Sequence, residues 1–528
     1  MSEQQPWEEV VARKQKQRAE ALTPFAAFPT CDAITDEDDV ATLAASIVSG
    51  KLTSEAVTRA YIARAYAAHE KTNCLTEVFF ADALKQAVEL DRHLTAHGKP
   101  VGPLHGVPVT LKDQFDVQGY DSTIGYVGRA FAPAEADSVL VAILKSLGAV
   151  ILAKTNLPQS IMPQWCETEN AMFGLTVNPV DKTYTPGGST GGESALLASH
   201  GSILGWGTDI GGSIRIPSHM LGLYGLKPSS ARLPYRGVPV STDGQEHVPS
   251  SVGPLARSLD SIRLAMEFVI GQRPWDKDAR CAPLPWRTSM YDDVLNRPLV
   301  FGVLRYDGVV RPHPPIARVL DETVEKLRAA GHVIVEWDAS LHAELIAVMD
   351  AFYSADGGED VRRDVALGGE PFIPHVARLV DRGPAISVYA YWQLNRRKMA
   401  LQQAYLDRWV ATACDAVLMP PMPHTAVPHR SCGWVGYTKV WNVLDYPALV
   451  LPAGTAAPKD LDAPWDGDSR PLLSGHPMDA ANRAIWAEHG ARMAALRLPV
   501  DVQVVCRKLE EEKVLGIGRV VDEVLRRM

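Results

Sequence analysis

The sequence predicts an α/β protein: a single large domain with a central mixed β-sheet covered by helices on both faces, and a helical extension at the N-terminus. Three observations predict this fold. Short apolar runs of strand length alternate with longer segments of helical period along most of the 528 residues. Hydrophobic residues make up 46% and charged residues 22% of the chain, as in ordinary globular proteins. No internal repeat, low-complexity tract or linker divides the chain.

The N-terminal 70 residues are predicted to form helices that pack on a larger domain of residues 71–528. A polar amphipathic helix is expected over residues 7–22. The next helix is expected to begin after the acidic residues of 35–38, because negative charge is favourable at a helix N-terminus. Thr53 is predicted to cap a further helix.

Strands and helices are expected to alternate after residue 70. The expected strands cover residues 78–80, 107–112, 149–153, 202–205, 299–304, 333–337, 415–419, 448–451 and 500–505. The expected helices include residues 81–97, 136–147, 388–410 and 509–527. Ligands of such sheets lie beyond the carboxyl ends of strands. Residues 114–135 are therefore predicted at the rim of a site, and residues 454–481, rich in Pro, Asp and Gly, are predicted to be an insertion.

Charge and cysteine content exclude several classes of protein. Lys and Arg number 53 against 62 Asp and Glu, so the net charge is −9, which argues against a nucleic-acid binder. The seven cysteines are scattered and odd in number, which indicates reduced thiols. The N-terminus has no apolar signal segment, and the most apolar stretch, residues 138–153, is too short to span a bilayer. We therefore expect a cytoplasmic protein without an integral membrane segment, and a homodimer is compatible with the sequence.

Glycine and serine concentrate in two similar clusters, Gly-Gly-Ser at 187–189 and again at 211–213. The clusters could cradle an anion, gather serine hydroxyls and N–H donors around one carbonyl oxygen, or simply pack tightly without chemistry. A phosphate-binding loop needs a lysine that residues 187–192 lack. Two cooperating serines would need a base, and no histidine has an informative position. The candidate base is Lys112, which ends a predicted strand and could otherwise be a surface lysine.

Five motifs together resemble the amidase signature family, over the chain from about residue 40 to the C-terminus. The similarity is greatest to fungal acetamidase-like enzymes and their fatty acid amide hydrolase relatives. The motifs are GGSTGGE at 187–193, GTDIGGSIRIP at 207–217, GLKP at 225–228, SVGP at 251–254 and PLHGVPVTLKD at 103–113.

The resemblance implies a Ser-Ser-Lys triad. Ser213 matches the nucleophile, Ser189 the bridging serine held by a cis peptide, and Lys112 the terminal base. Thr190 stands where many members have serine, and its hydroxyl is expected to keep an auxiliary hydrogen bond. The family's oxyanion hole maps onto the backbone N–H groups of Ile210, Gly211, Gly212 and Ser213.

The implied reaction is hydrolysis of a carboxamide through an acyl-enzyme, without a metal or cofactor, since no metal-binding spacing of Cys and His is present. Lys112 must be neutral to accept a proton, which requires its pKa to fall by about three units on burial. Asp113 is therefore expected to point away from the amine. Asp209 and Arg215 are interpreted as a structural ion pair in preference to substrate contacts.

Ile161, Met162 and Trp165 match the segment that lines the acyl side of the family's pocket. Such apolar walls favour aliphatic or aromatic acyl groups. Four aromatic residues further along either cover the other side or belong to the core: Trp434, Tyr437, Trp441 and Tyr446.

Several functions stay open beside the leading one, a hydrolase of small or medium carboxamides. The same triad would serve a fatty acid amide, acylethanolamide or carbamate hydrolase. A glutamine-hydrolysing subunit of a transamidating complex would require partner subunits. From other classes, a non-catalytic ligand-binding protein on an amidase scaffold and a nucleotide-binding ligase remain as alternatives.

Overall fold

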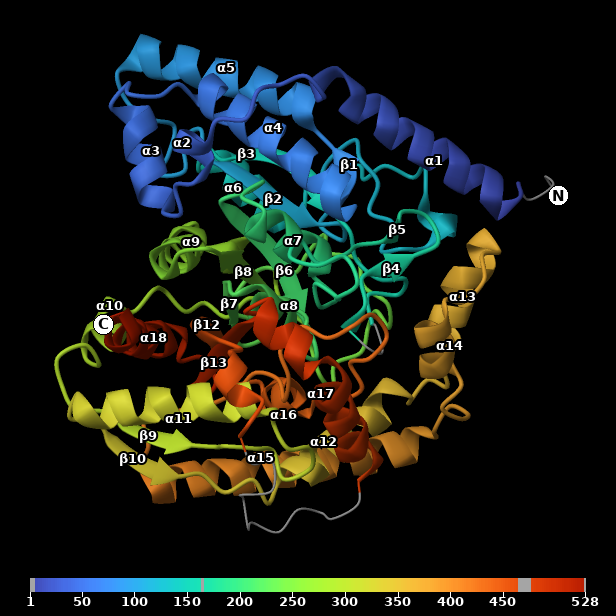
Figure 1. Ribbon diagram of the computed structural model, residues 1–528. Helices are drawn as coiled ribbons and strands as arrows, with labels where there is room; N and C mark the ends of the chain where they lie inside the picture. Colours follow the sequence, from blue (N-terminus) through green and yellow to red (C-terminus); the bar gives the residue numbers. More distant parts are fainter. Residues whose placement is uncertain (1–4, 163–165, 464–475, 527–528) are drawn as a thin grey trace.

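A computed structural model describes residues 5–162, 166–463 and 476–526. Its centre is one mixed 11-stranded sheet that runs through the whole molecule (Figure 1). From one edge to the other, the strands are β1 (Leu75–Val78), β3 (Val150–Thr155), β2 (Pro108–Lys112), β6 (Leu204–Asp209), β8 (Ser251–Ala256), β7 (Tyr224–Lys227), β12 (Ala448–Thr455), β13 (Pro499–Val505), β11 (Ala416–Met419), β9 (Val300–Val303) and β10 (Val333–Glu336). The predicted fold class, a single α/β domain with a mixed sheet, is confirmed.

Helices flank this sheet. One group, α4, α7 and α8, packs against β2, β6, β12 and β13, and another group, α9, α11 and α18, packs against β7, β8, β12 and β13. The helices are α1 (Trp7–Leu22), α2 (Asp32–Thr35), α3 (Val40–Val48), α4 (Ser54–Thr72), α5 (Phe80–His97), α6 (Val139–Ser146), α7 (Gly191–Ala198), α8 (Arg215–Leu221), α9 (Leu259–Gly271), α10 (Thr288–Asp292), α11 (Pro314–Ala329), α12 (His342–Tyr353), α13 (Glu359–Gly368), α14 (Pro374–Val380), α15 (Val388–Thr412), α16 (Gly436–Val443), α17 (Pro477–Ala495) and α18 (Glu511–Arg526).

The sheet contains two groups of parallel strands, with antiparallel pairs between them. β2 is parallel to both β3 and β6, and β9 is parallel to both β10 and β11. The strands between these groups pair antiparallel. Because parallel neighbours end at the same edge, the carboxyl ends of β2 and β6 bring Lys112 and Asp209 to one side of the sheet.

Two of the N-terminal helices contact the sheet, α1 at β1 and α4 at β2. α1 has the predicted bounds, and its Lys14 is buried in ion pairs of 2.5 Å with Glu77 and 2.6 Å with Asp121. Thr53 caps α4 as predicted, because its side chain accepts the N–H of Ala56. The boundary at residue 70 stays a prediction.

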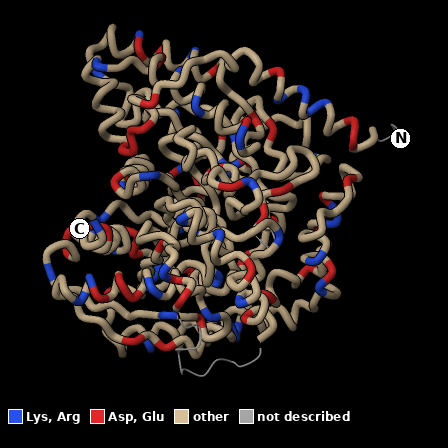
Figure 2. Tube along the Cα trace, in the orientation of Figure 1, with Lys and Arg blue, Asp and Glu red and all other residues tan. Residues whose placement is uncertain are grey.

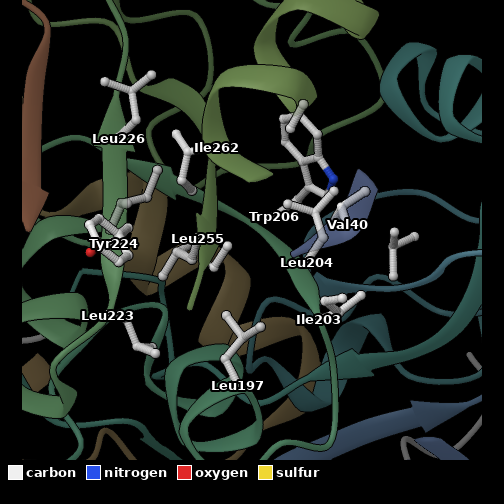
Figure 3. Packing of buried hydrophobic residues seen from close by; sticks show 14 of the residues in the cluster. Val40, Leu197, Ile203, Leu204, Trp206, Leu223, Tyr224, Leu226, Leu255 and Ile262 are labelled. Carbon is white, nitrogen blue, oxygen red and sulfur yellow. The ribbon is translucent and has the colours of Figure 1, made fainter. Parts of the chain in front are cut away.

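The core lies between the sheet and its helices. Figure 3 shows Leu204 and Trp206 of β6 among residues from α3, α9 and the strands beside them, including Val40, Leu255 and Ile262. The side chains of Leu204 and Trp206 are fully buried. This apolar packing holds β6, which carries the loop of residues 210–214 at its carboxyl end.

Three predicted boundaries are wrong. The strand expected at 78–80 lies at β1, and Phe80 already begins α5. The strand expected at 202–205 begins at Leu204 and runs on to Asp209 in spite of its two glycines, because β8 pairs with it along its whole length. Part of the expected insertion at 454–481 belongs to β12 and α17, and residues 464–475 lie outside the described residues.

Candidate active site

Lys112, the last residue of β2, is fully buried at the carboxyl edge of the sheet. Its Nζ lies within hydrogen-bonding distance of Ser189 Oγ, at 2.7 Å, and of Thr208 Oγ1, at 3.1 Å. Within the described ranges, none of the ion pairs shorter than 4 Å includes Lys112. Burial lowers the pKa of the amine to about 7, and the negative charge of Asp209 opposes that shift only in part.

Asp113 points away from Lys112, as predicted. Its carboxylate accepts hydrogen bonds from Thr76 Oγ1 at 2.9 Å, Thr123 Oγ1 at 3.0 Å and the N–H of Ile124 at 2.9 Å. These donors keep the carboxylate on the other side of the strand, so the neighbouring charge does not pair with the amine.

Ser189 lies in the glycine-rich loop before α7, fully buried, and the Gly188–Ser189 peptide bond is cis. A Cβ at Gly188 would lie 2.9 Å from the carbonyl oxygens of Cys166 and Glu167, so only glycine fits. The Thr190 N–H donates to the carbonyl oxygen of Ser213 at 3.2 Å, which ties this loop to the one after β6. The auxiliary Thr190 hydroxyl donates to the backbone oxygen of Thr208 at 3.4 Å.

Ser213 lies in the loop between β6 and α8, with 9% of its surface exposed. It lines a cavity of about 420 Å³ together with Gly188, Ile210 and Gly211. The structure therefore brings Ser213 and Gly188, the residue before Ser189, to one cavity, and Ser189 contacts the buried amine.

The Asp209–Arg215 ion pair stabilises the loop that carries Ser213. The pair is fully buried at 2.9 Å, and neither residue lines the cavity, which confirms its structural role. The Asp209 carboxylate also accepts the N–H of Gly212 at 2.8 Å and that of Ile214 at 3.1 Å. Burial alone would raise the pKa of Asp209, but the adjacent guanidinium holds it well below its usual value.

The N–H groups predicted to form an oxyanion hole differ in their availability. The carbonyl oxygen of Ile210 accepts the Tyr353 hydroxyl at 2.9 Å, and that of Gly211 accepts Thr438 Oγ1 at 2.7 Å. The N–H of a trans peptide points opposite to its carbonyl, so these contacts fix the direction of the following N–H groups. The N–H of Gly212 is already given to Asp209, so Gly212 is not a free donor, and the prediction for it needs this correction.

The cavity wall agrees in part with the sequence prediction. Ile161 and Met162 line the cavity, whereas Trp165 lies outside the described residues. Sequence reasoning missed other lining residues, such as Tyr353 of α12 and Lys439 of α16, because their helices lie far along the chain. A second cavity of about 480 Å³ adjoins the first, and Met162, Ile210 and Tyr353 line both.

Of the four aromatic residues, Tyr437, Trp441 and Tyr446 are part of the core, which favours the second of the two interpretations for them. Tyr437 and Trp441 are fully buried, and Tyr446 is 6% exposed, among Leu401, Tyr405 and Trp409. Trp434 packs against this cluster and donates to Asp307 Oδ2 at 2.5 Å. None of the four lines the described cavities.

Comparisons with known proteins decide the family. The profile of the amidase family matches residues 56–515. The chain belongs to the amidase family. Amidase 1 of Gibberella moniliformis is 52% identical over 98% of this chain and 99% of that protein. The acetamidase of Emericella nidulans is 38% identical over 99% of this chain and 98% of its own length. A solved fatty acid amide hydrolase superposes with a TM-score of 0.87 at 31% identity, over 99% of this chain and 91% of that one.

The predicted family is therefore confirmed, and the protein is an amidase-family hydrolase, an enzyme that acts on amides. Among the residues described, no helix is both long and apolar enough to cross a membrane. Lys and Arg are interspersed with Asp and Glu over the described part of this amidase (Figure 2). Its described residues also contain no cluster of three or more His, Cys, Asp or Glu suited to a metal ion.

Proposed function

We propose that the protein hydrolyses carboxamides through a Ser-Ser-Lys triad and a covalent acyl-enzyme. One observation carries the proposal: a fully buried amine with a pKa of about 7 lies 2.7 Å from the hydroxyl of Ser189. An unpaired amine of this kind is neutral in a large fraction of molecules at neutral pH, so it can accept a proton. The other proposed parts are Ser213 at the cavity and the N–H groups of Ile210, Gly211 and Ser213.

In the proposed reaction, Ser213 Oγ attacks the carbonyl carbon of the amide. Its proton passes to Ser189, while the proton of Ser189 passes to Lys112. The free N–H groups stabilise the oxyanion. As the C–N bond breaks, the proton returns through Ser189 to the leaving nitrogen, which departs as ammonia or an amine. Water then attacks the Ser213 ester by the same relay and releases the carboxylic acid.

Covalent labelling tests this proposal. A fluorophosphonate is expected to add once per chain and to map to Ser213 by peptide mass, because the activated hydroxyl displaces fluoride from phosphorus. Ser213→Ala should take up no label, while Ser218→Ala, a buried serine of α8 outside the cavity, should label like the wild type. Labelling at another residue, or none, would refute the assignment.

A longer acyl amide is the second candidate substrate. The similarity to a solved fatty acid amide hydrolase favours it, and so do the two adjoining cavities of about 420 and 480 Å³. Acetamide, benzamide and a long-chain acyl amide compared on the purified protein separate the candidates. A kcat/KM that rises steadily with acyl length would favour the long-chain substrate over small carboxamides.

Tyr353→Phe is expected to lower kcat about tenfold with little change in KM. The phenol donates to the carbonyl oxygen of Ile210, and this bond directs the N–H of Gly211 toward the proposed oxyanion. Burial raises the pKa of Tyr353 well above its usual value, so the hydroxyl remains a donor. Tyr391→Phe is the matched control, because Tyr391 lines only the second cavity. Equal rates in the two variants would contradict this role.

A further inference from the structure

Gln114 lies two residues after Lys112, and the orientation of its side-chain amide is fixed by its hydrogen bonds. Gln114 is fully buried, and its Nε2 donates to the carbonyl oxygen of Pro239 at 3.2 Å. A carbonyl oxygen can only accept, so the amide cannot be flipped without losing this bond. The Oε1 atom therefore faces Thr208, whose Oγ1 lies 2.6 Å away.

The hydroxyl of Thr208 is in turn fixed by Gln114. An amide oxygen accepts but cannot donate, so the single hydroxyl proton of Thr208 must point to Gln114 Oε1. The lone pairs of Thr208 Oγ1 then remain as the acceptor for Lys112 Nζ at 3.1 Å. Thr208 thus accepts a hydrogen bond from the amine and cannot donate one to it.

This arrangement leaves the lone pair of Lys112 Nζ available to Ser189. A neutral amine has two N–H bonds and one lone pair, and one N–H is held by Thr208. The lone pair is then available to the hydroxyl of Ser189, 2.7 Å from Nζ. Without Gln114, the Thr208 hydroxyl could rotate and donate to the same lone pair in competition with Ser189.

We propose that Gln114, acting through Thr208, is a positioning residue that aims the lone pair of Lys112 at Ser189. The inference rests on the proposed function, because it matters only if Lys112 is the base. It adds Gln114 and Thr208 to the proposed machinery as residues that act without substrate contact, because neither lines the cavity that Ser213 lines.

Few charged groups surround the hydrogen bonds that join Gln114, Thr208 and Lys112. Asp209 lies on the next strand, paired with Arg215. Asp113 is turned to other donors, as described above. Glu193 of α7 binds Thr110 and Thr155, and Lys154 of β3 donates to Ser122 and the oxygen of Asp121. A neutral substitution at Gln114 leaves all of these titratable groups in place, so a change in the pH profile would report on the hydrogen bonds themselves.

The test is a double-mutant cycle on the intact enzyme. Gln114→Met is expected to lower kcat about tenfold at unchanged KM and to move the acidic limb of the pH profile to lower pH, because a hydroxyl that donates to the lone pair favours the neutral amine. Adding Thr208→Val to Gln114→Met should then raise kcat severalfold, because the competing hydroxyl is gone. Gln402→Met, a change on α15 that lines neither cavity, should match the wild type.

The inference would be overturned if the losses of kcat from Gln114→Met and Thr208→Val merely added in the double variant. A Gln114→Met enzyme with wild-type kcat and pH profile would also overturn it. Gln114→Asn, one methylene too short to reach Pro239 and Thr208 together, repeats the test if the methionine variant does not fold. Fluorophosphonate labelling separates this inference from the proposed function. A labelled Ser213 with wild-type kcat in the Gln114 variants overturns the positioning role alone, whereas a wild type that takes up no label at Ser213 overturns both.

Discussion

Lys112→Met is expected to lower kcat/KM by about two to four orders of magnitude, the usual contribution of general base catalysis. Methionine fills nearly the same volume but has no lone pair basic enough to take the proton of Ser189. The measurement is kcat/KM on a simple carboxamide at pH 8. Lys145→Met is the control, because Lys145 is a partly exposed lysine that pairs with Asp137. A near-normal rate in Lys112→Met would remove the base from the mechanism.

The pH dependence of the wild-type rate should also report the protonation of Lys112. The proposed relay needs the neutral amine of Lys112, whose pKa is about 7, so kcat/KM is expected to fall below pH 7. Two pH units below the pKa, about one molecule in a hundred is neutral, and the rate should drop by roughly that factor. A rate that stays constant from about pH 5 to 9 would contradict the relay.

The buried Lys112 is also expected to lower the free energy of unfolding of the wild type. The folded state holds its pKa at about 7 while the unfolded value is 10.5, so the unfolded chain binds the proton more tightly. The penalty is complete below pH 7, amounts to roughly 5 kcal/mol at most, and disappears as pH rises to 10.5. Lys112→Met is therefore expected to unfold at a higher temperature than the wild type at pH 6, with the difference shrinking by pH 10.

The sequence predicts local features of this fold better than distant contacts. The helix at residues 7–22 and the cap at Thr53 depend on nearby residues, and both are confirmed. β7 and β8 were missed, because their glycine and proline content argues against strands and only their sheet neighbours make them strands. Such pairing joins residues far apart in the chain.

The site shows the same limit. Lys112, Ser189 and Ser213 could be proposed from the sequence because they lie in motifs with a recognisable order, and the structure places Lys112 beside Ser189. Tyr353 and Gln114 could not, because the roles proposed for them depend on a hydroxyl or an amide that meets a group from another element. Likewise, only the structure reveals that the N–H of Gly212 is taken by Asp209. Whether an N–H group is free or already bonded can be decided only when the positions of donor and acceptor are both known.

Asp209→Asn is expected to destabilise the protein by about 3–5 kcal/mol, the cost of leaving one member of a buried ion pair alone. Arg215 would remain fully buried, with the neutral side chains of Gln503 and Asn442 and a backbone oxygen as its acceptors. The measurement is the free energy of unfolding in urea at pH 7. The pKa of Asp209 is depressed in the folded state, so its contribution is complete above pH 3.8 and is lost only in stronger acid.

Activity should fall together with stability, because Asp209 also accepts the N–H groups of Gly212 and Ile214 on either side of Ser213. An asparagine amide offers one acceptor oxygen where the carboxylate offers two, so at least one of these bonds is lost. The exposed pair of Arg273 and Asp276, 2.7 Å apart, gives the control: Arg273→Ala should change neither stability nor rate measurably. If Asp209→Asn were as stable and active as that control, the carboxylate would not be what holds the Ser213 loop in place.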